Sequence, residues 1–141
     1  MSLEPLKPEV EEAIKQALNK SWSERTGIWT SENYQCRSAN QCMQTSLVIR
    51  EKFGGHILKT EVPSTSNGKI PHYYNFIGGQ RYDFTVDQFS GPEHAGWKGT
   101  YEDERVDVDV VEQRLNNDAY LQALYSAFDR EYKKLPNSDI T

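Results

Sequence analysis

The chain has 141 residues, enough for one compact domain, and 36% of them are apolar. Aromatic residues make up 11% of the chain, and because each buries a large area they offset the low apolar fraction. The formal net charge of −5 argues against nucleic-acid binding as the main role, since proteins of that class usually show a basic face. No apolar run reaches the length of a membrane span, and the first residues lack the apolar segment of a secretory signal.

We therefore expect a single cytoplasmic domain over residues 1–141, with 1–4 as an unstructured or appended start and 135–141 as a tail. In the cytoplasm Cys36 and Cys42 should stay reduced. Their Cys-x5-Cys spacing matches no common zinc pattern. Neither a metal nor an organic cofactor is expected.

The first predicted element is a helix from Pro8 to about Ser21. Proline suits the first helical turn, and the acidic residues that follow it suit the positive end of the helix dipole. Apolar residues then recur at helical spacing. Residues 23–37 show no periodicity and are expected to form an ordered loop.

A second helix follows, with Ser38 or Asn40 as its cap and Gly54-Gly55 as its end. Its apolar residues spread around much of its circumference, which predicts a largely buried helix. Cys42 lies in its first turn.

Three strands are predicted at about 56–62, 70–77 and 80–86, because these stretches are rich in β-branched and aromatic residues. Gly78 and Gly79 can supply the two positive φ angles of a tight hairpin turn between the second and third strands.

The remaining chain is predicted as a long loop and a terminal helix. Residues 90–105 are rich in glycine, and long loops in compact domains often cover functional sites. The acidic stretch 102–112 is expected to be a solvated face. From about Asp118 an amphipathic helix should run until Pro136 stops it.

The hairpin brings an imidazole and a carboxylate together. Pairing outward from the turn gives Ile77 with Gln80, Phe76 with Arg81, Asn75 with Tyr82 and Tyr74 with Asp83. His72 lies two residues before Tyr74, so it shares a sheet face with Asp83 and is its diagonal neighbour. A histidine held by a carboxylate is half of an acid–base relay, and such a relay needs a nucleophile.

Cys42 is the predicted nucleophile. The unpaired N–H groups and positive dipole at a helix N-terminus favour a thiolate. The backbone N–H of Cys42 can also serve as one donor of an oxyanion hole. The second donor is left open among Gln35, Asn40 and Gln41, and Trp29 and Trp97 are candidates to line a substrate groove.

Each residue of this set also has an ordinary structural explanation. A cysteine in an apolar helix is commonly a small buried side chain, and a strand histidine is commonly structural. Asp83 is the least ordinary, because aspartate disfavours strands and is costly to bury unpaired. The order of Cys42, His72 and Asp83 along the chain favours a joint catalytic role, and His94 is a weaker alternative base.

Four segments stand out in order along the chain: Gln41-Cys-x-x-Thr45, Phe53-Gly-Gly-x-Ile-Leu58, His72-Tyr-Tyr-Asn75 and Arg81-Tyr-Asp-Phe-Thr85-x-x-Gln88-Phe89. Over roughly residues 8–130 they resemble the YunG-like family of uncharacterised bacterial proteins. That family's biochemical role is undefined, so this resemblance implies a fold more than a function.

More distantly, the layout is similar to the papain-like and transglutaminase-like superfamily. This resemblance implies an α+β fold with a central helix in the N-terminal half packed on an antiparallel sheet, plus a first and a terminal helix. It implies Cys42 as nucleophile, His72 as general base and acid, and Asp83 as the orienting carboxylate. The sequence departs from the pattern at Met43, where an aromatic residue is often found, and at Gln35, one residue from the spacing of papain's oxyanion donor.

The resulting hypothesis is a thiol enzyme that attacks the amide, ester or thioester carbonyl of an unidentified small-molecule or peptide substrate, by hydrolysis or by transfer. One alternative is a non-catalytic binding or interaction module that keeps the fold. Another is a redox or thiol-sensing protein that uses Cys36 and Cys42.

Overall fold

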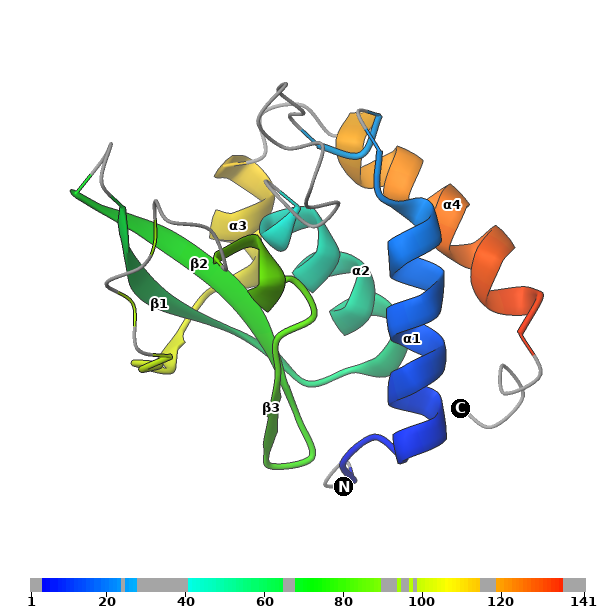
Figure 1. The fold of residues 1–141 in the computed structure, drawn as a ribbon, viewed down its shortest axis with the longest axis horizontal. Helices are drawn as coiled ribbons and strands as arrows, with labels where there is room; N and C mark the ends of the chain where they lie inside the picture. Colours follow the sequence, from blue (N-terminus) through cyan, green and yellow to red (C-terminus); the bar gives the residue numbers. More distant parts are fainter. Residues whose placement is uncertain are drawn as a thin grey trace.

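The computed structural model describes residues 4–23, 25–27, 41–64, 68–89, 94, 97, 99–114 and 119–135. Its elements in chain order are α1 (Pro8–Ser21), α2 (Cys42–Phe53), β1 (His56–Ser64), β2 (Gly68–Ile77), β3 (Gln80–Tyr82), the 3-10 helix η2 (Val86–Phe89), β4 (Glu104–Arg105), α3 (Val108–Arg114) and α4 (Ala119–Lys133). The described strands form one antiparallel sheet in the order β3-β2-β1-β4. The predicted α+β class is thus confirmed. Figure 1 shows α1, α2 and α4 gathered beside the sheet, where α2 contacts both β2 and α4.

Helix α1 has the predicted bounds. Pro8 occupies its first turn with Glu9 and Glu11, which complement the positive end of the dipole. One face of α1 is buried and the opposite face carries charged residues, among them Lys15, which pairs with Glu11 at 3.4 Å. This amphipathic pattern packs α1 against α4.

Helix α2 begins at Cys42, so the thiol lies in the first turn as predicted. Gly54 follows the helix with a φ of 83°, a left-handed conformation that glycine adopts without steric penalty. The predicted caps Ser38 and Asn40 lie outside the described residues, as does most of the predicted loop 23–37.

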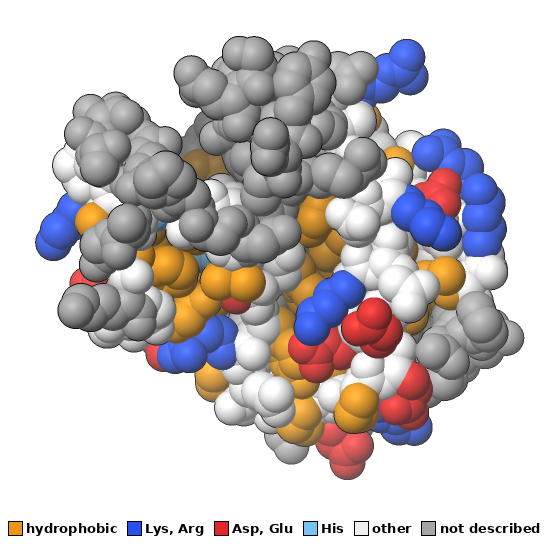
Figure 2. Space-filling model, viewed as in Figure 1, with side chains coloured by type: hydrophobic (Ala, Val, Ile, Leu, Met, Phe, Trp, Pro, Cys, Tyr) orange, Lys and Arg blue, Asp and Glu red, His pale blue; other side chains and the backbone are white. Residues whose placement is uncertain are grey.

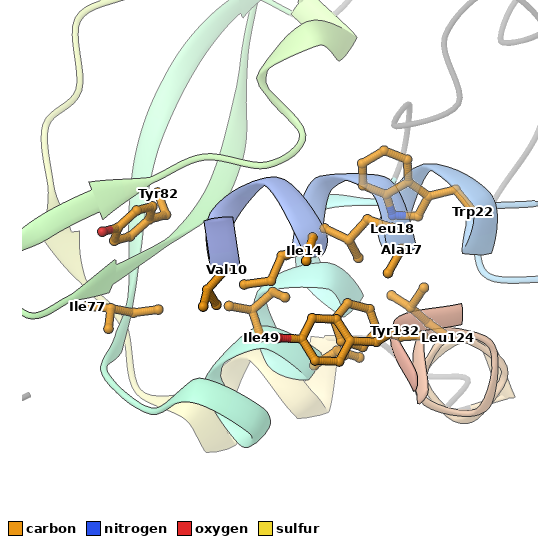
Figure 3. Close-up of a cluster of buried hydrophobic side chains, with 13 residues drawn as sticks. Val10, Ile14, Ala17, Leu18, Trp22, Ile49, Ile77, Tyr82, Leu124 and Tyr132 are labelled. Carbon is orange, nitrogen blue, oxygen red and sulfur yellow. The ribbon is translucent and has the colours of Figure 1, made fainter. Parts of the chain in front are cut away.

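The main core lies between α1, α2, α4 and the turn end of the β2–β3 hairpin (Figure 3). Its buried members are Val10, Ala13, Ile14, Ala17, Leu18, Trp22, Val48, Ile49, Ile77, Tyr82, Leu124, Phe128 and Tyr132. Full burial of one large aliphatic or aromatic side chain stabilises a fold by about 1.5–3 kcal/mol. This core therefore holds α2, and the cysteine at its start, in a rigid frame.

The predicted register of the β2–β3 hairpin is confirmed for the three pairs nearest the turn. The described pairs are Ile77 with Gln80, Phe76 with Arg81 and Asn75 with Tyr82. However, β3 ends at Tyr82, and the prediction of a strand to residue 86 is wrong. The chain turns at Phe84 and Thr85 into η2, where the backbone N–H of Gln88 bonds the Thr85 carbonyl at 3.1 Å. Asp83 therefore follows the strand instead of lying on it.

The β1–β2 hairpin is longer than predicted, with paired residues from His56 opposite Phe76 to Ser64 opposite Gly68. Because β3 is short, the half of β2 before Asn75 pairs with β1 but not with β3. The part of β2 that carries His72 is therefore reached by the residues that follow β3.

Besides η2, two further short elements were not predicted. Strand β4 lies within the stretch expected to be a loop at 90–105, and α3 lies partly within the acidic stretch 102–112. Helix α4 begins within one residue of the prediction, and its predicted stop at Pro136 lies outside the described residues. Among the described helices, none is long and apolar enough to cross a membrane.

Candidate active site

The first turn of α2 is anchored to the chain segment that follows α1. The Thr26 hydroxyl donates to the Gln41 side-chain oxygen at 2.8 Å, and the Gln44 side-chain amide donates to the Thr26 carbonyl at 2.5 Å. The Gln41 side-chain amide donates to the Ser23 carbonyl at 3.4 Å. All three of Thr26, Gln41 and Gln44 are buried, and buried polar groups stabilise a structure when they are hydrogen-bonded in this way.

Two further bonds fix α2 between α1 and the sheet. The Trp22 indole donates to the Thr45 hydroxyl at 3.0 Å, and the Asn75 side chain donates to the Ser46 carbonyl at 3.0 Å. These contacts explain why a buried helix carries polar residues in its first half. They also set the position of Cys42 relative to β2.

His72 and Asp83 form the hydrogen-bonded pair that the hairpin predicts. His72 Nε2 lies 2.7 Å from Asp83 Oδ2, and the two side chains are 0% and 6% exposed. A pair so far removed from water is little screened by solvent. The bond orients the imidazole with Nε2 toward the carboxylate, while Nδ1 has no hydrogen-bond partner among the described residues.

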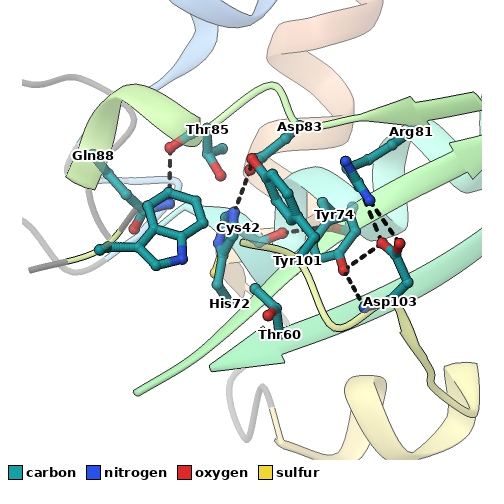
Figure 4. A network of polar contacts seen from close by, with 12 residues as sticks. Cys42, Thr60, His72, Tyr74, Arg81, Asp83, Thr85, Gln88, Tyr101 and Asp103 are labelled. Atoms are coloured by element: carbon teal, nitrogen blue, oxygen red, sulfur yellow. Dashed lines mark hydrogen bonds and ion pairs between the residues drawn. The ribbon is translucent and has the colours of Figure 1, made fainter. Parts of the chain in front are cut away.

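The Cys42 thiol lies beside the imidazole. Figure 4 shows Cys42, His72 and Asp83 in one cluster. Burial, the largest single contribution, lowers the pKa of His72, but the bond with Asp83, the contact with Cys42 and the charges of both groups raise it from 6.5 to about 9. Since Nδ1 has no formed hydrogen bond, Cys42 is near enough to favour the imidazolium without being bonded to it in this conformation.

Access to solvent differs between the two groups. Cys42 is partly exposed, whereas His72 is fully buried. A reagent or substrate would therefore reach the pair from the side of the thiol.

Aromatic side chains enclose the imidazole. The Phe89 ring packs edge-on at 4.5 Å between centroids, Tyr74 lies at 5.7 Å, and Trp97 at 6.4 Å. Trp97, a predicted groove residue, thus contacts the site. Burial by apolar rings strengthens the electrostatic coupling between His72 and Asp83.

Tyr101 closes the carboxylate side of the site. Its hydroxyl donates to Asp83 Oδ2 at 2.7 Å, the oxygen that also bonds His72. Burial, followed by the bond to Asp83 and its charge, raises the pKa of Tyr101, so the phenol remains a donor at neutral pH. Oδ1 of Asp83 and the Thr85 hydroxyl, both buried, have no hydrogen-bond partner among the described residues.

The segment that carries Tyr101 is tied to the sheet by ionic and hydrogen-bonded contacts. Arg81 makes two bonds to Asp103, at 3.0 and 2.6 Å, and its guanidinium lies 4.1 Å from the centroid of the Tyr101 ring. The Tyr74 hydroxyl donates to Asp103 at 2.8 Å. The hydrogen bond from Arg81, despite some opposing burial, lowers the pKa of Asp103.

The same segment is also bonded to β1. The backbone N–H of Glu102 donates to the Thr60 hydroxyl, and the Glu102 carboxylate accepts from the backbone N–H of Glu61, each at 2.9 Å. Residues 100–103 therefore cross from β1 to β3 above His72.

A groove of about 420 Å³ lies on the surface near the candidate site, and Asp83 is one of its lining residues. It runs between α1 and the residues after β3, and its lining includes Glu12, Lys15, Trp22, Asp83 and Phe84. Figure 2 shows charged side chains of both signs on this face, beside a run of hydrophobic ones. The groove offers a mixed polar and apolar surface next to Asp83.

The remaining site candidates from the sequence either bond elsewhere in the fold or lie outside the described residues. The Gln41 side-chain amide group is bonded to Ser23 and Thr26, so this conformation does not offer it as an oxyanion donor. Trp29, Gln35, Asn40 and Cys36 lie outside the described residues. His94 Nδ1 lies 2.9 Å from the Pro63 carbonyl.

Tyr101 and Thr85 were missed by sequence reasoning as members of this site. Tyr101 is 18 residues from Asp83 along the chain, in a stretch with no periodicity to link them. Thr85 lies in the stretch that the sequence predicted to continue the third strand. Among the described residues, no group of three or more His, Cys, Asp or Glu side chains is placed to hold a metal ion.

Comparison with known proteins identifies relatives but no function. The sequence model of a family described as "YunG protein" matches residues 10–132. A protein of Bacillus subtilis (strain 168) named "Uncharacterized protein YunG" is 44% identical over 82 residues, which cover 57% of this chain and 64% of that protein. The match thus spans just under two thirds of the relative's length. No solved structure matches the chain.

Proposed function

The chain belongs to the YunG family, and from that premise we propose that Cys42, His72 and Asp83 form a thiol relay for acyl transfer. The reaction is attack on an amide, ester or thioester carbonyl, completed by water in hydrolysis or by an amine in transfer. The substrate is a small molecule or a peptide.

The observation that carries this proposal is the 2.7 Å bond between His72 and Asp83, together with the open Nδ1 beside Cys42. A carboxylate that bonds one ring nitrogen fixes the tautomer and leaves the other nitrogen to exchange a proton with a nucleophile. A pKa of about 9 for His72 keeps the imidazole protonated at neutral pH, which favours an ion pair with a thiolate.

In the first half-reaction the Cys42 thiolate forms a bond to the carbonyl carbon, and the carbonyl oxygen becomes an oxyanion. The backbone N–H of Cys42, at the first helical position, has no acceptor within the helix and serves as one donor to that oxygen. As the bond to the leaving amine, alcohol or thiol breaks, His72 Nδ1 gives it a proton. This leaves a thioester on Cys42 and a neutral imidazole.

In the second half-reaction His72 Nδ1 takes a proton from water or an amine, which attacks the thioester. The carbon–sulfur bond then breaks and Cys42 leaves as a thiolate beside the restored imidazolium. Asp83 orients the imidazole throughout and stabilises the imidazolium.

We further propose that the fold is a distant variant of the papain-like and transglutaminase-like arrangement. The chain order supports it: a cysteine starts the central helix, and the histidine and aspartate follow on the sheet and just after its next strand. The position of Asp83 after β3 is a difference from the expected arrangement.

The test is alkylation of Cys42 by iodoacetamide as a function of pH, in a Cys36→Ser background so that one thiol reports. We expect fast labelling near neutral pH, and a rate at least tenfold lower in His72→Ala. Asp83→Asn should lower the rate less. His56→Ala is the matched control, because His56 lies on β1 and is exposed. Ordinary thiol reactivity in all four proteins would rule the relay out.

A second candidate function, a binding module without catalysis, is favoured by the complete burial of His72. In that case the His–Asp pair is structural and Cys42 is inert. The two functions separate in the same experiment, because His72→Ala then reduces the free energy of unfolding without changing the rate of alkylation in the folded protein.

A further inference from the structure

A second hollow lies at the opposite end of α2 from the thiol. It encloses about 290 Å³ and is lined by Arg50, His56, Ile57, Arg105, Val106, Asp107 and Val108. Arg50 lies in the last turn of α2, eight residues after Cys42, or about 12 Å along the helix axis. This hollow is therefore separate from the candidate active site.

One guanidinium in the hollow is held by an imidazole. Arg105 Nη2 lies 3.0 Å from His56 Nδ1. The same arginine nitrogen lies 3.4 Å from His56 Nε2, so the guanidinium faces the imidazole ring. An imidazole carries no negative charge in any protonation state, so it does not neutralise the charge of Arg105.

The second guanidinium has no described partner. Arg50 is half-buried and makes no ion pair or side-chain hydrogen bond within the described part of the chain. By contrast, Arg81 pairs with Asp103 and Arg130 with Glu131. Two arginines that have no carboxylate partner among the described residues thus line one hollow, in a chain of net charge −5.

Asp107 is the acidic residue of the lining. Its Oδ1 already accepts a bond from the backbone N–H of Asp109 at 2.9 Å. Against this one carboxylate stand the guanidiniums of Arg50 and Arg105, so these three residues carry one positive charge in excess. The excess charge favours an anionic ligand.

From this arrangement we infer that the hollow binds a phosphate group. Arg50 and Arg105 come from different elements, so a ligand bound by both must present oxygens in different directions. A tetrahedral phosphate has such oxygens. A carboxylate has two oxygens in one plane and suits a single guanidinium better. Free phosphate and a phosphate ester share this chemistry.

The experiment is an NMR titration of the full chain with inorganic phosphate, methyl phosphate and acetate, following the amide signals of His56, Val106 and Asp107. We expect saturable shifts with inorganic phosphate at a dissociation constant of about 1 mM or tighter, and at least tenfold weaker binding of acetate. Equal saturation by methyl phosphate identifies an ester as an acceptable ligand. Binding of inorganic phosphate alone identifies the free anion.

Arg50→Gln and Arg105→Gln should each weaken phosphate binding at least tenfold. Arg130→Gln is the matched control, since it removes an exposed arginine on α4 and should leave binding unchanged. The inference is overturned if shifts do not saturate, if acetate binds as tightly as phosphate, or if all three variants bind alike.

Discussion

Tyr101 and His72 share one oxygen of Asp83. The Tyr101 hydroxyl and His72 Nε2 each lie 2.7 Å from Oδ2, while Oδ1 has no hydrogen-bond partner among the described residues. Two donors on the same oxygen divide its negative charge between them. Tyr101 therefore limits how strongly Asp83 stabilises the imidazolium.

Removal of this hydroxyl should raise the pKa of His72. In Tyr101→Phe the ring stays, but Oδ2 of Asp83 is hydrogen-bonded to His72 alone. The pKa of His72 should therefore rise above about 9. In Asp83→Asn it should fall toward or below 6.5, because burial, the largest contribution, then acts with less opposition. NMR of the imidazole Cε1–H signal measures both.

Tyr120→Phe is the control for this pair of variants, since Tyr120 lies on α4 and should not affect His72. An unchanged or lower pKa of His72 in Tyr101→Phe contradicts the shared-oxygen interpretation. So does a pKa that stays near 9 in Asp83→Asn.

The turn glycines offer a second prediction, because they share a conformation but differ in surroundings. Gly78 and Gly79 have φ of 59° and 79°. A Cβ on Gly78 would meet the backbone of Glu4 and Pro5, whereas a Cβ on Gly79 would meet nothing within 4 Å. Gly79→Ala should cost about 1 kcal/mol from the left-handed backbone, and Gly78→Ala distinctly more, since the segment 4–5 must move. Urea denaturation compares them, and equal losses contradict the prediction.

This hairpin also shows what the sequence could predict. The Gly78-Gly79 turn sets the register of the pairs up to Asn75 and Tyr82, and that register correctly implied contact between His72 and Asp83. Successive side chains of a strand alternate between its two faces. The register that a tight turn sets therefore decides which residues of the two strands share a face.

The end of β3 was beyond such reasoning. Tyr82-Asp-Phe-Thr-Val86 has strand composition, but its backbone leaves the sheet after Tyr82. A turn at Phe84–Thr85 replaces the strand there. The bonds that Asp83 makes to His72 and Tyr101 are tertiary contacts. Tertiary contacts override local preference for strand.

Short elements were missed for a related reason. A strand of two residues and a helix of seven are too short for periodicity to reveal. Tyr101 was missed because its partner lies across the fold, and no local spacing connects a loop tyrosine to Asp83.

Asp103 provides a third prediction. It is a non-glycine residue with a φ of 54°, and its carboxylate accepts bonds from Tyr74 and Arg81. Asp103→Asn keeps an acceptor and tolerates the left-handed conformation, so it should cost within about 1 kcal/mol. Asp103→Val loses both bonds and is strained, and should cost about 3 kcal/mol.

Chemical denaturation measures these two free energies of unfolding, and amide exchange of residues 101–105 reports whether the segment has loosened. Arg130→Ala, which breaks an exposed pair on α4, should have little effect on either. Similar losses in Asp103→Asn and Asp103→Val would contradict the role of backbone conformation at this position.

The raised pKa of His72 predicts that the protein loses stability as the pH rises from neutral. The pKa of His72 is about 9 in the folded chain, whereas an unperturbed histidine, as in the unfolded chain, has a pKa of 6.5. The folded chain therefore binds this proton more tightly. The resulting stabilisation is complete below about pH 6.5, declines above it and is lost as the pH passes 9. Its upper limit is about 3 kcal/mol. The groups that face His72 are Asp83, Cys42 and Tyr101, which bonds Asp83.

Urea denaturation at intervals across this pH range measures the effect as a slope of unfolding free energy against pH. The slope should be smaller in His72→Gln, and the difference in slope between the two proteins isolates His72, because the other titrating groups remain in both and cancel. His56→Gln is the matched control and should keep the slope of the wild type. An equal slope in wild type and His72→Gln would mean that the buried imidazole is neutral at pH 7, and the thiolate–imidazolium pair would then lose its physical basis.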